Sequence, residues 1–141
     1  MALLWQNTMS VGNDAIDHDH RYLISFVNTI ELVLQSPEDK KSIMIALEQL
    51  YEYGEEHFKK EEAIQRKIKY PQSLNHKHSH SKLLDQLKVV QAKVKGLESS
   101  GEISKYAPEL TTYLRGWLVN HVFNEDMLLK PYLLKHPKGL Y

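Results

Sequence analysis

The hexapeptide "NHKHSH", residues 75 to 80, places three histidines at alternate positions, His76, His78 and His80. On a β-strand all three side chains would lie on one face, because side chains there repeat every two residues. On an α-helix each residue turns by about 100°, so His76 and His80 share a face while His78 points about 200° away from His76. The element that contains this hexapeptide therefore decides both the fold and the kind of site.

Helical periodicity extends over most of the chain, and turn signals are few. The first break is "QSPED" (35–39), where Ser36 is a candidate N-cap with Pro37 at the first helical position. Further breaks are "KYPQS" (69–73), "GLESSGE" (96–102) and "HPKG" near the C-terminus. These signals predict a single domain, residues 1–141, with an N-terminal arm (1–15) and helices at roughly 17–35, 38–68, 72–96 and 105–130.

Each of the four segments has an apolar stripe at steps of three and four residues, and each stripe is interrupted by histidine. Such stripes face inward in an antiparallel bundle, and short connections make neighbouring helices antiparallel. The sequence therefore predicts an all-α fold, an up-down-up-down antiparallel four-helix bundle with a metal site in its core, and leaves His78 on the surface. The stripes are Ile16, His20, Leu23, Val27, Ile30, Leu34; Ile43, Leu47, Leu50, Gly54, His57, Glu61, Ile64, Ile68; Ser73, His76, His80, Leu83, Leu87, Val90, Val94, Leu97; and Leu110, Leu114, Trp117, His121, then Glu125 or Asn124, then Leu128.

The composition excludes several other classes of protein. With 141 residues, 42% of them apolar, the chain suits one domain with a real core. Lysine plus arginine balances aspartate plus glutamate at 18 each, and we expect no nucleic-acid partner because no basic run occurs. Cysteine is absent, which excludes a thiolate site. Without a positively charged leader or a long apolar run, we expect a soluble, cytoplasmic protein with no membrane span.

Histidine on all four stripes is the feature that points to function. A single histidine on an apolar stripe is usually a hydrogen-bonded core residue. Five buried imidazoles would each need partners, and a buried carboxylate one turn after His57 adds to the cost unless a metal satisfies them all. Nitrogen and oxygen ligands without sulfur suit iron, zinc, copper or nickel, and this number of ligands exceeds one tetrahedral zinc. The candidate metal ligands at this point are His20, His57, Glu61, His76, His80 and His121.

Four motifs resemble those of the hemerythrin family, and most closely its single-domain bacterial members, the bacteriohemerythrins. "IDHDHRYLISFVN" (16–28), together with Trp5, is similar to the family's opening. "HFKKE" (57–61) matches HxxxE, and "YPQSLNHKHSH" (70–80) matches the turn followed by HxxxH. "WLVNHVFNED" (117–126) matches HxxxxD and adds Asp126 to the candidates. The resemblance covers nearly the whole chain.

The resemblance implies reversible dioxygen binding at a non-haem centre of two iron ions (Fe2+/Fe3+) with a bridging oxo or hydroxo group. It assigns His20 and His57 to the iron that binds dioxygen. It assigns Trp117 and Leu118 to the wall of the dioxygen pocket. The other iron takes three histidines and both irons share two bridging carboxylates; these five ligands are His76, His80, His121, Glu61 and Asp126.

The sequence departs from the family pattern at two positions beside ligands. Asp19, flanked by His18, stands where a glutamine is usual, and Ser79 stands where a glutamate commonly precedes the second histidine of HxxxH. Neither is a ligand, so both departures bear on groups that tune the site. Helical geometry alone favours Glu125, four residues after His121, over Asp126, because five residues rotate by about 140°. The family pattern selects Asp126.

Three functions remain open, and a dioxygen carrier, store or delivery protein ranks first. Carboxylate-rich di-iron sites more often activate dioxygen, whereas a histidine-rich set should favour binding without further chemistry. A di-iron oxidase, peroxidase or nitric-oxide-handling enzyme ranks second, and one of the eight tyrosines could then be redox-active. An oxygen sensor ranks third, because 141 residues leave no room for an output domain. We expect no catalytic residues, a monomer, and an oxygen-consuming partner protein that the sequence does not identify.

Overall fold

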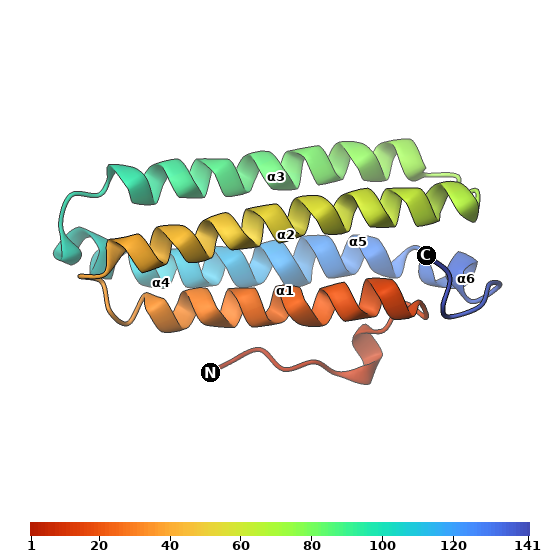
Figure 1. Cartoon of the computed structure of the whole chain (residues 1–141), viewed down its shortest axis with the longest axis horizontal. Helices are drawn as coiled ribbons and strands as arrows, with labels where there is room; N and C mark the ends of the chain where they lie inside the picture. Colours follow the sequence, from red (N-terminus) through yellow and green to blue (C-terminus); the bar gives the residue numbers. More distant parts are fainter.

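Four long helical rods lie side by side in the computed structural model, which describes all 141 residues and contains no strand (Figure 1). Successive rods run in opposite directions and are joined by short connections, so the predicted up-down-up-down bundle is confirmed. The fourth rod is composite: an α-helix continues into a π-helix and then a short α-helix. In chain order the elements are η1 (Asn7–Met9), α1 (Asp14–Val33), α2 (Lys40–Lys67), α3 (Ser73–Gly96), α4 (Ser100–Gly116), η2 (Trp117–Phe123), α5 (Asn124–Met127) and α6 (Lys130–Leu133).

Side-chain caps set the starts of α1, α2 and α4. Asn13 accepts a hydrogen bond from the backbone of Ile16, so α1 begins at Asp14 rather than near residue 17. Ser99 accepts one from the backbone of Glu102, which starts α4 at Ser100 instead of near residue 105. Each cap satisfies a backbone N–H that has no partner within the helix.

The predicted N-cap of the second helix is wrong. Asp39, not Ser36, caps α2, and its carboxylate accepts hydrogen bonds from both the backbone N–H and the hydroxyl of Ser42. The backbone carbonyl of Ser36 instead accepts a hydrogen bond from the N–H of Asp39. Pro37 therefore lies in the turn before the helix, where its fixed φ is equally well tolerated.

The predicted stripes are buried along the first three helices. Every stripe position of α1 and α2 is buried, and so are the six stripe positions of α3 from His76 to Val94, whereas Ser73 and Leu97 at its ends are only partly covered. His78 is exposed, as the helical reading of the hexapeptide predicts. The periodic pattern therefore identified the inward faces of these three helices correctly.

The fourth stripe departs from the prediction after Trp117. In the π-helix η2 the buried positions are Trp117, Leu118, Val122 and Phe123, whereas His121 is exposed, as is Leu128 further along the chain. A π-helical turn holds one more residue than an α-helical turn, so it moves the inward face along the chain. Asp126 is consequently buried, while Glu125 is only partly covered.

Both chain ends pack along the bundle. Leu3 exchanges two hydrogen bonds with the side chain of Asn28 on α1, which holds the N-terminal arm against that helix. The C-terminal tail returns to the start of α1, where the side-chain amide of Asn13 donates to the carbonyl of Leu140. Gly12, at this junction, has a φ of +84°, and a Cβ there would lie 2.9 Å from Leu134. That position therefore favours glycine.

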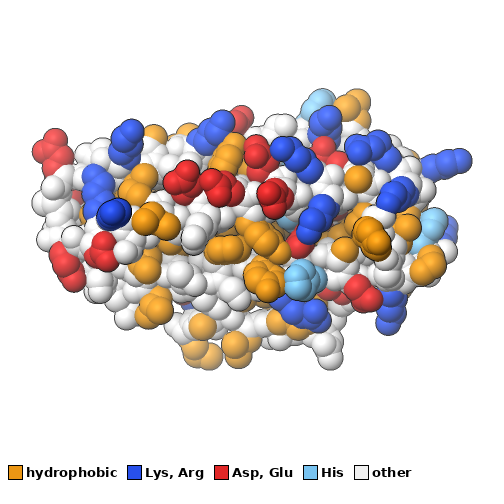
Figure 2. Space-filling view, viewed as in Figure 1, with side chains coloured by type: hydrophobic (Ala, Val, Ile, Leu, Met, Phe, Trp, Pro, Cys, Tyr) orange, Lys and Arg blue, Asp and Glu red, His pale blue; other side chains and the backbone are white.

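The surface mixes charges of both signs. On the face shown in Figure 2, lysine and arginine side chains alternate with aspartate and glutamate, and apolar side chains are scattered between them. No helix of this bundle combines the length and the apolar character that crossing a membrane requires.

Candidate metal centre

Six polar side chains form one layer inside the bundle, between two apolar clusters. On the side of α4 lies a core of 21 residues that includes Leu23, Phe58 and Phe123. On the other side lies a cluster of seven that includes Ile64 and Leu129. Each residue of this layer is at most 5% exposed. The six residues are His20, His57, Glu61, His76, His80 and Asp126.

The imidazole Nε2 atoms of this layer converge on two carboxylates. Asp126, from α5, has one oxygen 2.7 Å from His20 Nε2 and the other 2.9 Å from His76 Nε2. Glu61, from α2, has one oxygen 2.7 Å from His76 Nε2 and 3.3 Å from His80 Nε2, and the other 3.1 Å from His57 Nε2. Each carboxylate thus contacts histidines from different helices.

These contacts define two overlapping sets of four candidate ligands. Within each set, one ligand atom per residue lies within 4.8 Å of the others. One set contains His20 and His57, the other contains His76 and His80, and both contain Glu61 and Asp126. Such an overlap describes two cation positions that share two carboxylates.

The residues present suit metal ions better than they suit one another. His57 Nε2, Glu61 Oε2 and His80 Nε2 are fully buried and make no hydrogen bond, although oppositely charged atoms lie close to them. Buried polar atoms without a partner carry a desolvation cost of about 1–3 kcal/mol each. Cations between the two carboxylates and the imidazoles would satisfy these atoms together.

Proximity to the carboxylates also raises the pKa values of two histidines, His57 and His76. Burial alone would lower the pKa of His57, but the nearby carboxylates of Asp126 and Glu61 and the hydrogen bond to Asp19 raise it well above its ordinary value. The same competition raises the pKa of His76 to about 10 through Asp126 and Glu61. When no metal is bound, protons on these imidazoles therefore offset the negative charge of the carboxylates.

The two carboxylates respond in the opposite sense. Burial alone would raise the pKa of Glu61, but its contacts with His57, His76 and His80 hold it well below the ordinary value. The pKa of Asp126 is also lowered, because contacts with three histidines outweigh both burial and the nearby charge of Glu61. Both groups are therefore negatively charged at neutral pH, as ligands for cations must be.

Two further carboxylates contact the outer nitrogens of the histidines. Asp19 Oδ2 lies 3.0 Å from His57 Nδ1, and Glu62 Oε2 lies 2.9 Å from His80 Nδ1. Burial would raise the pKa of Asp19, but hydrogen bonds from His57 and Tyr53 and the charge of Lys60 lower it to about 2. The sequence singled out Asp19 only as a departure from the family pattern and missed Glu62, which directly follows the ligand motif HxxxE.

His121 lies outside the layer. It is exposed on the π-helix η2, and neither set of candidate ligands includes it. His121 and Asp126 are five residues apart, and the π-helix ends at Phe123, so the segment that follows brings Asp126 inward while His121 points away. Phe123, rather than His121, is buried beside the layer, with its ring centroid 4.7 Å from that of His20.

The two predicted pocket residues lie in the core beside the layer. Trp117 and Leu118 are buried, and the indole N–H of Trp117 donates to the backbone carbonyl of Leu83 on α3. Trp117 packs near Phe58, whose ring stacks on His80 at a centroid distance of 4.0 Å. Apolar rings therefore cover one side of the histidine layer.

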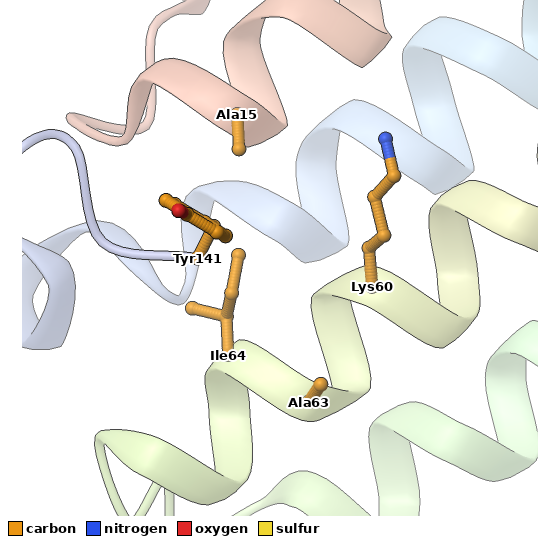
Figure 3. A pocket seen from close by; sticks show the side chains of 5 residues that line it. All are labelled: Ala15, Lys60, Ala63, Ile64 and Tyr141. Carbon is orange, nitrogen blue, oxygen red and sulfur yellow. The ribbon is translucent and has the colours of Figure 1, made fainter.

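A hollow of about 350 Å³ lies between α1, α2 and the C-terminal residue (Figure 3). Tyr141 lies across it between Ala15 and Ile64, and Lys60 stands at its edge. Its walls contain no histidine and no carboxylate side chain, so it is separate from the candidate metal layer.

An all-helical bundle whose core holds imidazoles around two shared carboxylates defines a class, the helical-bundle proteins that bind metal ions through histidine and carboxylate side chains. Comparison with known families agrees with this class. Residues 11–133 match the model of the hemerythrin HHE cation binding domain, and the chain belongs to the hemerythrin family.

Several relatives are similar over nearly the full chain. A bacteriohemerythrin of Stenotrophomonas maltophilia is 28% identical over 127 residues, which cover 89% of this chain and 78% of the relative. A hemerythrin-like protein of Naegleria gruberi is 26% identical over 126 residues, 89% of each chain. Among solved structures, a wild-type hemerythrin superposes with a TM-score of 0.78 at 26% identity, covering 94% of this chain and 98% of that one.

Proposed function

We propose that this protein binds dioxygen reversibly at a centre of two iron ions, for carriage, storage or delivery. The observation that supports this most is the pair of overlapping ligand sets, each with two histidines and both sharing Glu61 and Asp126. The family supplies the identity of the metal and of the small molecule. When bound, the two irons would supply the electrons that a reversible bond to dioxygen requires.

The proposed ligands follow the two sets. His20 and His57 would hold one iron, His76 and His80 would hold the other, and Glu61 and Asp126 would be shared by both, with an oxo or hydroxo group as the further bridge. Asp126 takes the bridging role in preference to Glu125, because Asp126 is buried within contact of three histidines. The family motif HxxxxD would add His121 as a seventh ligand, whereas in this structure His121 is exposed outside the layer.

The chain's own residues would keep dioxygen chemistry reversible by excluding water. Trp117, Leu118 and Phe58 are at most 2% exposed beside the layer, and an apolar cover limits both hydrolysis and proton entry. Histidine outnumbers carboxylate among the ligands, and neutral ligands stabilise strongly oxidised iron less than anionic ones do. Both features favour binding over oxidation of a second substrate.

The test is an absorption spectrum of the iron-loaded protein, reduced without air, exposed to dioxygen and purged again. We expect a visible charge-transfer band that appears with dioxygen and disappears on purging, over several cycles. Irreversible oxidation with consumption of an added reductant would instead indicate a di-iron oxidase or peroxidase. Zinc bound in place of iron, with no visible band, would contradict the di-iron assignment.

A further inference from the structure

The outer nitrogen of one histidine in each ligand set contacts a carboxylate that is not itself a candidate ligand. His57 Nδ1 lies 3.0 Å from Asp19, and His80 Nδ1 lies 2.9 Å from Glu62. His57 belongs to the set with His20, and His80 belongs to the set with His76. The two contacts are therefore distributed one to each cation position.

A carboxylate at Nδ1 determines which ring nitrogen is protonated. Because a carboxylate only accepts hydrogen bonds, Nδ1 carries the proton in this contact, and the lone pair of Nε2 is then available to a cation beside the shared carboxylates. The contact also fixes the plane of the ring and makes the imidazole a stronger electron donor. Nε2 of both His57 and His80 is buried without a hydrogen bond, as a nitrogen reserved for a metal would be.

The two contacts differ in how firmly the carboxylate is held. Asp19 is only 1% exposed and accepts a 2.8 Å hydrogen bond from the hydroxyl of Tyr53, while Lys60 Nζ lies 3.3 Å from both of its oxygens. The side chain of Glu62 is 16% exposed, on the rim of the bundle. Water screens the contact of Glu62 with His80 more than it screens that of Asp19 with His57.

We propose that Asp19 and Glu62 are positioning residues, one for each iron: Asp19 orients His57 and Glu62 orients His80, with Asp19 exerting the larger effect. This inference rests on the proposed di-iron centre and deepens it. It assigns a role to two residues outside the predicted ligand set, one of which stands at a departure from the family pattern.

The test compares Asp19→Asn and Glu62→Gln with the wild-type protein and with Glu56→Gln. Glu56 is an exposed acid beside His57 in the chain, so its variant removes the same charge with no contact to a ligand ring. Iron affinity is measured by competition with a chromophoric chelator, and the midpoint potential by anaerobic redox titration. Far-UV circular dichroism of the metal-free variants checks that each still folds.

In Asp19→Asn we expect one of the two irons to bind about 10- to 100-fold more weakly, the range found when such outer hydrogen-bond partners are removed. The midpoint potential should rise, because a weaker donor stabilises ferric iron less. Glu62→Gln should weaken the other iron by a smaller factor, and Glu56→Gln should match wild type. Adding His76→Ala to Asp19→Asn should remove both tight sites, whereas adding His20→Ala should leave one.

Unchanged affinity and potential in both Asp19→Asn and Glu62→Gln would overturn the inference. A wild-type protein that binds two irons but no dioxygen would contradict the proposed function and leave this inference standing. Wild-type protein with fewer than two irons would contradict both.

Discussion

Glu61 is the side chain on which both cation positions depend. Its two oxygens lie within 3.3 Å of imidazole nitrogens from His57, His76 and His80, and it belongs to both ligand sets. In Glu61→Ala we expect both irons to bind more than about 100-fold more weakly, since losing an outer hydrogen-bond partner alone costs about 10- to 100-fold. In His76→Ala only one iron should be lost. Iron per chain, measured after gel filtration, distinguishes the two results.

The matched control is His78→Ala, which removes an exposed imidazole from the same helix as His76 and His80. It should retain two irons. Retention of both irons by Glu61→Ala would show that Glu61 is not shared and would contradict the bridged arrangement.

At the scale of single residues, the sequence predicts six of the seven proposed ligands at places that the structure brings together. Helical spacing suffices for His57 with Glu61 and for His76 with His80, because one turn of an α-helix separates each pair. Spacing does not predict which residue contacts the outer ring nitrogen, Nδ1, of each histidine. Glu62 reaches His80 across the interface between α2 and α3, a contact that depends on how two helices pack.

At the scale of elements, the π-helix η2 is the feature that the sequence pattern does not predict. A periodicity of 3.6 residues continues the fourth stripe from Trp117 to His121, whereas the observed inward face passes through Leu118 and Val122. "WLVNHVF" contains no glycine or proline, so no local sequence signal predicts the change from α-helix to π-helix. The departure falls beside the candidate site, where π-helical turns often occur.

His121 is the residue for which this element matters most. Hydrogen bonds in a π-helix span five residues, so residues five apart lie nearly one above the other. Extension of the π-helical turn toward Asp126 would bring His121 to the same side as that carboxylate. We therefore expect iron binding to protect His121 from modification by diethylpyrocarbonate, and His121→Ala to weaken one iron. Peptide mass spectrometry reports the modification, with the exposed His78 as an internal control.

Equal modification of His121 with and without iron, together with two tightly bound irons in His121→Ala, would remove it from the ligand set. Five of the remaining ligands would then lie on α1, α2 and α3, and Asp126 alone would come from the fourth rod.

At the scale of the whole molecule, the stripes predict the bundle because each is a long, regular apolar face and the connections between them are short. The helix starts are predicted less well, as α1 and α4 show, because Asn13 and Ser99 become recognisable as caps only from the hydrogen bonds that they make. The polar layer divides the apolar core into two clusters. The stability of the fold should therefore depend on what neutralises the charges in this layer.

Protein stripped of metal with a chelator should be most stable between pH 4.5 and 6.5. The pKa of His76 is raised from 6.5 to about 10, so its contribution to the free energy of unfolding is complete below pH 6.5 and is lost as the pH rises toward 10. The pKa of Glu61 is lowered from 4.5, so its contribution is complete above pH 4.5 and is lost as the pH falls through the lowered value.

Iron should remove the alkaline part of this dependence, because cations take the place of the protons on the imidazoles. The gap in unfolding midpoint between iron-loaded and stripped protein should consequently widen from pH 6 to pH 9, as measured by thermal unfolding under anaerobic conditions. From pH 6 to pH 9, the unfolding midpoint of metal-free His76→Ala should fall less than that of the metal-free wild type. A stripped wild-type protein that gains stability from pH 6.5 to 9 would show that the layer is not held by protonated histidines facing ionised carboxylates.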